Sequence, residues 1–492
     1  MNSIFSNIRY QPLRPQTYFP VWFAHQGLMV FFIAWILCTK LFGYGMEVRY
    51  AIVAALSTTL FFIGGKVLYK NNCRSSEKLF IKRVFWVGFA VRLCWVFYCY
   101  FYFNEAYYGQ KIGDTADTVW YVEFGQDIAR WIQNGFEISF EQVRANNAAA
   151  IDDCGYPFWL AIIYLLVGVE NDVFVPMLVK CVVSALSAIL IYRIGQRHFG
   201  EFAGRVAGIF VALNPNIIYW CGTMYKEAEL VFLCCLFVNE MDKALGRNTK
   251  LTFKALLPAT MIGLYLFFYR SALGLVAFLA MFSHVVLASQ KIISWGKKVL
   301  AGVMVAAVLL IGMGENIRYQ TRKVVETVQS DAQQQDMAHR SKMKGGNSFA
   351  KYAGAAVFAP LIFTIPFPTF NMANESQVLQ MELSGGNFIK NLLSFFVILS
   401  LVVLLFSGEW RKHVFIIAYT CGYLACLTLS NFAHSSRFHM PIWPMLMLFG
   451  AFGISLVQQN KKWKKMWPIM LIAEVAICVV WNWFKLKGRG MI

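Results

Sequence analysis

Long apolar stretches separated by short polar runs make up most of this chain of 492 residues. A membrane-spanning helix needs about 20 consecutive, mostly apolar residues, and on that basis the pattern predicts thirteen spans. The predicted spans cover 21–39, 50–69, 84–103, 173–192, 204–220, 227–242, 254–269, 271–289, 298–314, 388–407, 413–430, 438–457 and 467–484. We therefore expect an all-α polytopic membrane protein with two large loops, at 104–172 and 315–387, on one face.

The distribution of charge predicts which loops share a side of the membrane. Cytoplasmic loops carry an excess of Lys and Arg, which assigns to the cytoplasm the N-terminus and the basic loops near 70–83, 193–205, 243–254, 291–298 and 461–465. Residues 104–155 have the opposite bias, with nine acids and three bases, and are predicted to lie outside. One conflict remains, because thirteen spans leave Lys485, Lys487 and Arg489 outside, so the side of the C-terminus stays open.

Composition supports a membrane protein. Hydrophobic residues make up 58% of the chain and charged residues only 14%, about half the usual share for a soluble domain. The net charge of +19 would suggest nucleic acid as the partner of a soluble protein. Here the basic residues lie between apolar stretches, so we expect contact with membrane lipids and no nucleic acid. No Walker, zinc-ligand or Rossmann motif is present in the sequence.

The first outer loop contains two predicted helices. From Gly113 the sequence reads GDTADTVWYVEFGQDIARWIQNG, in which apolar residues such as Tyr121, Phe124 and Ile128 recur at helical spacing. This pattern predicts an amphipathic helix in the outer interface. The segment GYPFWLAIIYLLVG then forms an apolar helix of about 14 residues, too short to span the bilayer.

Acidic residues flank these two helices. Asp117 is open to two interpretations: a helix N-cap, for which Asp is favoured, or a general base that accepts a proton from a hydroxyl. Asp114, Asp152 and Asp153 are either solvated loop acids or further members of a site. No cofactor is assigned, and a divalent cation is left open.

Four cations lie in or at the ends of predicted spans. Arg92 is in the middle of a span, where a charge is functional or paired inside the bundle. Lys226, which precedes Glu227, is predicted at the outer end of its span, as are Arg270 and Arg437. These three could converge on a phosphate, which Arg binds in a bidentate manner. Alternatively, each extends to the lipid headgroups independently.

Taken in order, several segments resemble the GT-C membrane glycosyltransferases, a superfamily that includes protein O-mannosyltransferases and aminoarabinose transferases. The resemblance runs from about Val84 to about Leu456 and is carried by FAVRLCWVFYCYFY, DTVWY, CGYPFWLAIIYLLVG, HFGEFAGRVAGIFVALNPNIIYWCGTMYKEAELVF and SRFHMPIWPMLML. Each motif alone is weak, whereas their order and spacing together are more specific. The acidic doublet common in that family is absent, because Thr118 follows Asp117.

The resemblance implies a sugar donor linked to polyprenyl phosphate, an acceptor that is a glycan, lipid or protein, and inversion at the anomeric carbon. It implies a base at Asp117, with Asp114 as the alternative base and Asp153 as a second acid. It also implies donor phosphate binding by Arg437 and Arg270, with Lys226 as a weaker candidate. Tyr121, Glu227 and Arg92 are expected to support the site. The implied location is the bacterial cytoplasmic (inner) membrane, with the site facing the periplasm.

With this resemblance, the chain divides into four predicted parts. Residues 1–80 are an addition of two spans, 81–314 the catalytic module, 315–387 the second outer loop and 388–492 the C-terminal helices. Two other functions are retained as alternatives. One is a lipid-linked glycan polymerase or ligase, and the other a lipid or glycan transporter, although no inverted repeat typical of transporters is evident.

Overall fold

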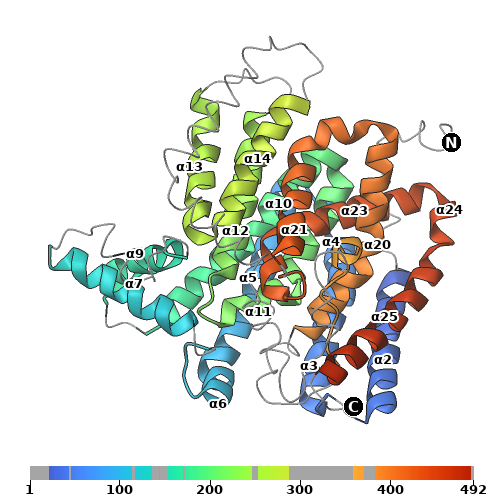
Figure 1. Ribbon diagram of the computed structural model, residues 1–492, viewed down its shortest axis with the longest axis horizontal. Coiled ribbons are helices and arrows are strands. Elements are labelled where there is room, and N and C mark those ends of the chain that lie inside the picture. Colours follow the sequence, from blue (N-terminus) through green and yellow to red (C-terminus); the bar gives the residue numbers. More distant parts are fainter. Residues whose placement is uncertain are drawn as a thin grey trace.

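The computed structural model describes residues 21–43, 46–113, 117–135, 143, 153–169, 172–245, 253–287, 358–370, 383–430 and 432–488. These residues form helices joined by turns, with no strand in the described ranges. Figure 1 shows most of the helices gathered into one bundle, while α7 and α9 lie together at its left edge. The predicted all-α fold is therefore confirmed for the described residues.

The helices follow one another with few irregular segments. The N-terminal part contains α2 (Val21–Phe42), α3 (Val48–Thr59), η2 (Leu60–Gly64), α4 (Gly65–Asn72), α5 (Glu77–Tyr98), η3 (Cys99–Phe103) and α6 (Asn104–Tyr108). The middle part contains α7 (Asp117–Gln133), α9 (Gly155–Val167), α10 (Phe174–Leu213), α11 (Pro215–Tyr219), η4 (Trp220–Gly222), α12 (Glu227–Ala244), α13 (Phe253–Tyr269) and α14 (Ser271–Leu287). The C-terminal part contains η5 (Ala359–Leu361), α20 (Ser384–Ser407), η7 (Glu409–His413), α21 (Val414–Leu429), α22 (Ser436–His439), η8 (Met440–Ile442), α23 (Trp443–Gln459), α24 (Lys461–Lys464) and α25 (Trp467–Gly488).

Helix α10 reverses direction at Gly200, where φ is 87° and ψ is 172°. Glycine adopts a positive φ without the strain that a side chain would cause. The two limbs of α10 then pack closely, because a Cβ on Gly195 would lie only 2.7 Å from the Cα of Gly204. Small residues allow such close helix contacts. This element is therefore a helical hairpin. Its first limb contains the predicted span 173–192, whereas the predicted span 204–220 is divided between its second limb, which ends at Leu213, and the short elements α11 and η4.

Eight helices in the described ranges are long and apolar enough to cross a membrane. They include the α10 hairpin as a single element, and they support a multi-pass membrane protein. The predicted spans 254–269 and 271–289 correspond to shorter apolar helices, and 227–242 corresponds to α12, whose 18 residues include five charged ones. The predicted span 298–314 lies outside the described residues, so the predicted total of thirteen is not confirmed.

The first and last described helices, α2 and α25, are in contact with each other. Helices α2 and α25 pack side by side (Figure 1), and the indole Nε1 of Trp467 donates a hydrogen bond to Gln26 at 2.8 Å. Helix α3 also contacts α20. The predicted N-terminal addition therefore packs against the C-terminal helices.

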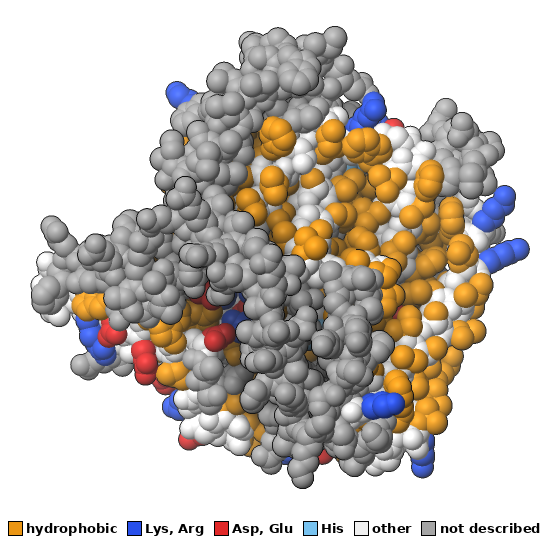
Figure 2. Space-filling model, in the orientation of Figure 1, with side chains coloured by type: hydrophobic (Ala, Val, Ile, Leu, Met, Phe, Trp, Pro, Cys, Tyr) orange, Lys and Arg blue, Asp and Glu red, His pale blue; other side chains and the backbone are white. Residues whose placement is uncertain are grey.

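Loops that the charge rule assigns to one side lie together in space. Arg205 donates hydrogen bonds to the backbone carbonyls of Asn72 and Ser75, which connects the α10 turn to the α4–α5 turn. Arg197, near the same α10 turn, pairs with Asp242 at the end of α12. The contacts agree with the predicted threading of these loops. Figure 2 shows apolar side chains over much of the visible bundle, with Lys and Arg mainly at its margins.

The second outer loop is described at 358–370 and from 383 onward, and the rest of it lies outside the described residues. Beyond the short η5 turn, the backbone from Ile365 to Phe370 is non-helical and buried. Lys390 donates to the carbonyl of Ile365, and the Asn482 side chain accepts a hydrogen bond from the backbone N–H of Phe370 at 2.7 Å. Non-helical backbone within a membrane protein needs hydrogen-bond partners from the protein or from a water-filled cavity. Lys390 and Asn482 supply such partners to the Ile365 carbonyl and the Phe370 N–H.

Candidate functional site

Five helix ends meet at one side of the bundle and bring together most of the predicted site residues. Asp117 lies in the first turn of α7, and Lys226 and Glu227 open α12. Arg270 is the single residue between α13 and α14, and Arg437 lies in the short helix α22. The apolar stretches place these elements in the bundle, and the polar breaks between them put charged side chains at a common end.

Arg437 is at the centre of this cluster. Its Nε donates to Oε1 of Glu227 at 2.7 Å, and its NH1 donates to Oδ2 of Asp117 at 2.5 Å. The guanidinium also lies over the ring of Tyr225, 4.2 Å from the centroid, a favourable cation–π geometry. Its NH2 nitrogen makes no hydrogen bond to the described residues, so one donor edge remains available.

Arg270 holds Glu227 from a second direction. Its NH2 donates to the same Oε1 of Glu227 at 3.3 Å, and its NH1 donates to the Tyr423 hydroxyl at 3.0 Å. Its guanidinium stacks on Phe438, 4.6 Å from the ring centroid. Arg270 is thus bound on both terminal nitrogens, which suits a residue that positions its neighbours.

The solvent exposure of the side chains increases sharply across the cluster. The side chain of Glu227 is fully buried, that of Arg437 is 20% exposed, and that of Asp117 is 49% exposed. A buried charge is costly unless it is paired, and two guanidinium groups balance the two carboxylates here. Oε2 of Glu227 is buried and has no hydrogen-bond partner among the described residues. The cluster therefore presents the accessible carboxylate of Asp117 beside Arg437, whose guanidinium is held in place by the buried Glu227.

Lys226 and Asp153 form a neighbouring pair. Nζ of Lys226 forms an ion pair with Asp153 and donates to the Tyr269 carbonyl at 2.5 Å. Its side chain is only 2% exposed, so it is less accessible to a ligand than Arg437. Asp153 itself has a φ of 69°, an uncommon value for a residue other than glycine. The pair fixes the segment that enters α9.

Tyr121 contributes to the wall beside these ion pairs. Its ring is buried and packs edge-on against Tyr156, with the centroids 5.3 Å apart. Nζ of Lys226 lies 5.8 Å from the same ring. Burial raises the pKa of Tyr121 above its ordinary value, so the phenol is neutral at pH 7.

Arg92 belongs to a different part of the bundle. Its Nε donates to the Ser184 hydroxyl at 2.8 Å, and its terminal nitrogens donate to the carbonyls of Gly88, Val211 and Ala212. Val211 and Ala212 are in the last turn of α10, where helix carbonyls lack partners within the helix. Arg92 thus joins α5 to both limbs of the α10 hairpin, and its described contacts do not reach the cluster around Arg437.

The sequence analysis missed Lys180, which lies on α10 behind the cluster. Its Nζ donates to the Thr223 carbonyl at 2.6 Å and to the carbonyl of Tyr225, and lies 3.7 Å from Glu229. These bonds hold the turn that presents Tyr225 to Arg437. A lone lysine inside an apolar run was the available signal, since ionisable residues within spans are rarely without a role.

Two predicted acids lie outside the described residues, namely Asp114 and Asp152. Within the described ranges, no three His, Cys, Asp or Glu side chains gather to hold a metal ion. The possible role of a divalent cation therefore stays open, as it was from the sequence.

Comparisons with known proteins leave the function to be argued from this geometry. No protein-family model, no curated protein and no solved structure matches the chain. The resemblance noted from the motifs thus remains a hypothesis.

Proposed function

We propose that the chain is a membrane glycosyltransferase that moves a sugar from a polyprenyl-phosphate-linked donor to a hydroxyl of an acceptor. One observation carries the proposal: the exposed carboxylate of Asp117 lies beside Arg437, whose NH2 makes no hydrogen bond to the described residues. An inverting transfer needs a base and a phosphate-binding cation on opposite sides of one anomeric carbon, so we expect the bound donor to separate the Asp117–Arg437 ion pair and to insert its sugar between the two side chains.

In the proposed reaction, the acceptor oxygen attacks the anomeric carbon while Asp117 takes its proton. The bond from the anomeric carbon to the phosphate oxygen breaks, and the polyprenyl phosphate leaves with the electron pair. Arg437 stabilises the charge that develops on this leaving group. Attack opposite the leaving group inverts the configuration at the anomeric carbon.

The remaining residues are assigned supporting roles. Glu227, buried between two arginines, fixes the direction of the Arg437 side chain. Arg270 positions Glu227, and Lys226 positions Asp153 at the entrance to α9. The sequence had grouped Arg270 and Lys226 with Arg437 as phosphate ligands, and their burial favours positioning roles instead.

We further propose that the cluster faces the periplasm of a bacterial inner membrane. The acidic bias of residues 104–155 and the basic loops at the other end of the bundle support this orientation. Single cysteines at the exposed positions Asn134 and Lys465, introduced after replacement of the accessible native cysteines, provide a test. We expect an impermeant maleimide to label Asn134→Cys in intact cells and Lys465→Cys only after permeabilisation. The reverse pattern would refute the orientation.

The activity is tested with purified protein in liposomes that contain labelled polyprenyl-phosphate sugars and a membrane extract as acceptor. We expect the label to move onto an extract component, with release of polyprenyl phosphate. A parallel uptake assay addresses the transport alternative. Movement of an intact lipid-linked sugar across the bilayer, with no transfer from any donor in the panel, would contradict the proposal.

A further inference from the structure

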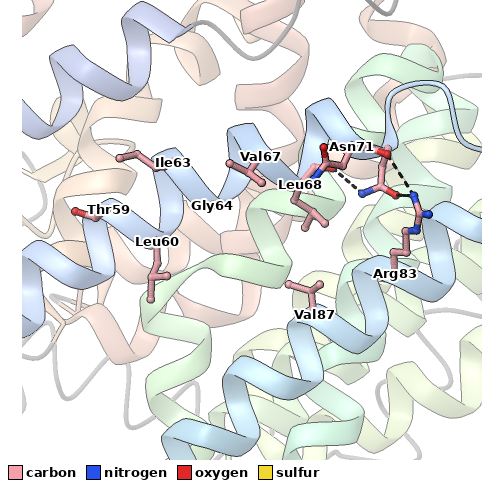
Figure 3. A pocket seen from close by; sticks show the side chains of 10 residues that line it. Thr59, Leu60, Ile63, Gly64, Val67, Leu68, Asn71, Arg83 and Val87 are labelled. Carbon is pink, nitrogen blue, oxygen red and sulfur yellow. Dashed lines mark hydrogen bonds between the residues drawn. The ribbon is translucent and has the colours of Figure 1, made fainter.

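A long groove lies at the other end of the bundle from the candidate site. It runs between the continuous helix α3–η2–α4 and helix α5, and has a volume of about 840 Å³. Its apolar lining includes Leu60, Ile63 and Val67 (Figure 3). These three side chains are 40–52% exposed, a large apolar exposure that suits contact with lipid.

The local structure explains why the surface is hollow here. Residues Leu60–Gly64 form a π-helical turn, which locally widens the helix. Gly64 offers no side chain to fill the space, and a Cβ built there would contact Leu213 of α10 at 3.6 Å. Both flanking helices pack on α10. The end of α10 therefore forms the floor of a channel whose two sides are the helix α3–η2–α4 and helix α5.

One end of the groove is polar and positively charged. NH1 of Arg83 donates to the Asn72 side chain at 3.0 Å and to the Asn71 carbonyl at 3.2 Å (Figure 3). Its Nε and NH2 make no hydrogen bond to the described residues. The segment 70–83 holds five cations and one acid, so this end attracts anions.

The groove has the length of one lipid leaflet. Thr59 and Asn72 mark its two ends, and thirteen helical steps at about 1.5 Å each separate them by about 20 Å. Half of the hydrocarbon core of a bilayer is about 15 Å, and a headgroup adds several more. A cation at one end of an apolar channel of this length matches an anionic lipid.

We propose that this groove binds one anionic phospholipid, with its phosphate on Arg83 and an acyl chain along Leu60, Ile63 and Val67. The charge rule assigns this end to the cytoplasmic leaflet, which is rich in anionic lipid. The proposal is independent of the reaction proposed for the opposite end.

A second groove offers an internal comparison. It lies on the other side of α5 against α10, has a volume of about 380 Å³ and includes Phe97, Leu178 and Val182 in an entirely apolar lining. With no cation in its lining, we expect it to accept acyl chains without preference for the headgroup.

Native mass spectrometry of the purified, delipidated full chain tests the assignment. Phosphatidylglycerol, phosphatidylcholine and inorganic phosphate are titrated separately. We expect one tight phosphatidylglycerol site that Arg83→Gln weakens about five- to tenfold, while Lys82→Gln, an exposed neighbour outside the groove, has little effect.

Val67→Trp should block the same site, whereas Leu56→Trp, on the same helix outside the groove, should not. Val182→Trp in the second groove should leave the headgroup preference unchanged.

All five positions are partly or largely exposed, so the variants are expected to fold, and their thermal unfolding in detergent is measured in parallel. Equal losses for Arg83→Gln and Lys82→Gln would overturn the proposal in favour of a diffuse attraction. Tight binding of phosphatidylglycerol that survives Val67→Trp would also overturn it. If inorganic phosphate bound as tightly as the lipid, the occupant would be a free anion and the acyl-chain assignment would fail.

Discussion

Two arginines in this bundle, the fully buried Arg92 and the partly buried Arg437, have opposite relations to their surroundings. Every nitrogen of Arg92 that can donate does so, to oxygen atoms of α5 and of both α10 limbs. Arg437 is bound to two carboxylates, its NH2 has no partner among the described residues, and one of the two carboxylates, Asp117, is half exposed. Arg92 is bound by backbone and hydroxyl groups on every nitrogen, whereas Arg437 is bound by carboxylates that a ligand can displace or join.

The difference shows that burial of a charge does not by itself identify a site. A guanidinium bound in this way stabilises packing, since the carbonyls of Val211 and Ala212 at the end of α10 would otherwise lack a donor. An unsaturated one beside an accessible carboxylate can exchange partners with a substrate. Substitutions at the two arginines should therefore separate a role in folding, for Arg92, from a role in the transfer reaction, for Arg437.

The largest effect is expected from Asp117→Asn, which removes the proposed base. The rate of transfer should fall by about 10²–10⁴-fold, with unchanged expression and thermal unfolding, because the side chain is half exposed. The matched control is Asp127→Asn, since Asp127 lies on the same helix, is 48% exposed and also pairs with an arginine. If Asp114→Asn abolished transfer and Asp117→Asn did not, the base would be Asp114.

Arg92→Leu should act on stability instead. It leaves the carbonyls of Val211 and Ala212 without their donor, and we expect a loss of about 1–3 kcal/mol of unfolding free energy. Denaturant unfolding in detergent measures this loss, while turnover per folded molecule should stay near the wild-type value. Ser184→Ala, which removes a single bond to Arg92, should cost less. A turnover defect in stable Arg92→Leu protein would remove the distinction between the two arginines.

Arg437→Lys should weaken donor binding by about 10–150-fold, because a charge-assisted bond worth about 1.5–3 kcal/mol is lost and Lys offers only a point charge. Titration of the purified variant with donor lipid provides the measurement, and acceptor affinity should change little. Arg130→Lys on the exposed face of α7 is the control. If Arg437→Lys kept the wild-type donor affinity, Arg437 would contact lipid headgroups and not the donor phosphate.

The smallest effect is expected for Arg270→Lys and Tyr423→Phe. Both alter the support of Glu227 without touching the accessible edge of Arg437. We expect less than about a tenfold loss of donor affinity in each, and a loss as large as that of Arg437→Lys would make Arg270 a direct phosphate ligand. Donor titration of the two variants distinguishes these outcomes.

The parts of the fold that repeat locally could be predicted from the sequence. The apolar period around Tyr121 and Phe124 predicted α7, and the length of GYPFWLAIIYLLVG predicted a short α9. Arg437 and Asp117 were each singled out from sequence as candidates. Their contact could not be derived, because 320 residues separate them and only tertiary packing brings α22 to α7.

Other features had no simple pattern. The count of spans was uncertain where polar residues interrupt apolar runs, as in α12, and the reversal at Gly200 gave no signal beyond a lone glycine. Lys180 was visible as a charge inside a span, yet two of its partners are the backbone carbonyls of Thr223 and Tyr225, which have no sequence signature. Lys226, Arg270 and Arg437 were grouped because each was predicted at the outer end of a span, whereas burial separates Arg437 from Lys226.

The α10 hairpin imposes an order on biosynthesis. Helix α5 is synthesised before residues 174–213, so Arg92 enters the membrane when Ser184, Val211 and Ala212 do not yet exist. An arginine at the centre of an isolated inserting helix costs about 2.5–3.5 kcal/mol. We therefore expect the insertion machinery to retain α5 until the whole α10 hairpin has emerged from the ribosome. A ribosome-bound chain that ends before Leu213 should remain crosslinked to that machinery through α5, and one that ends well beyond it should be released.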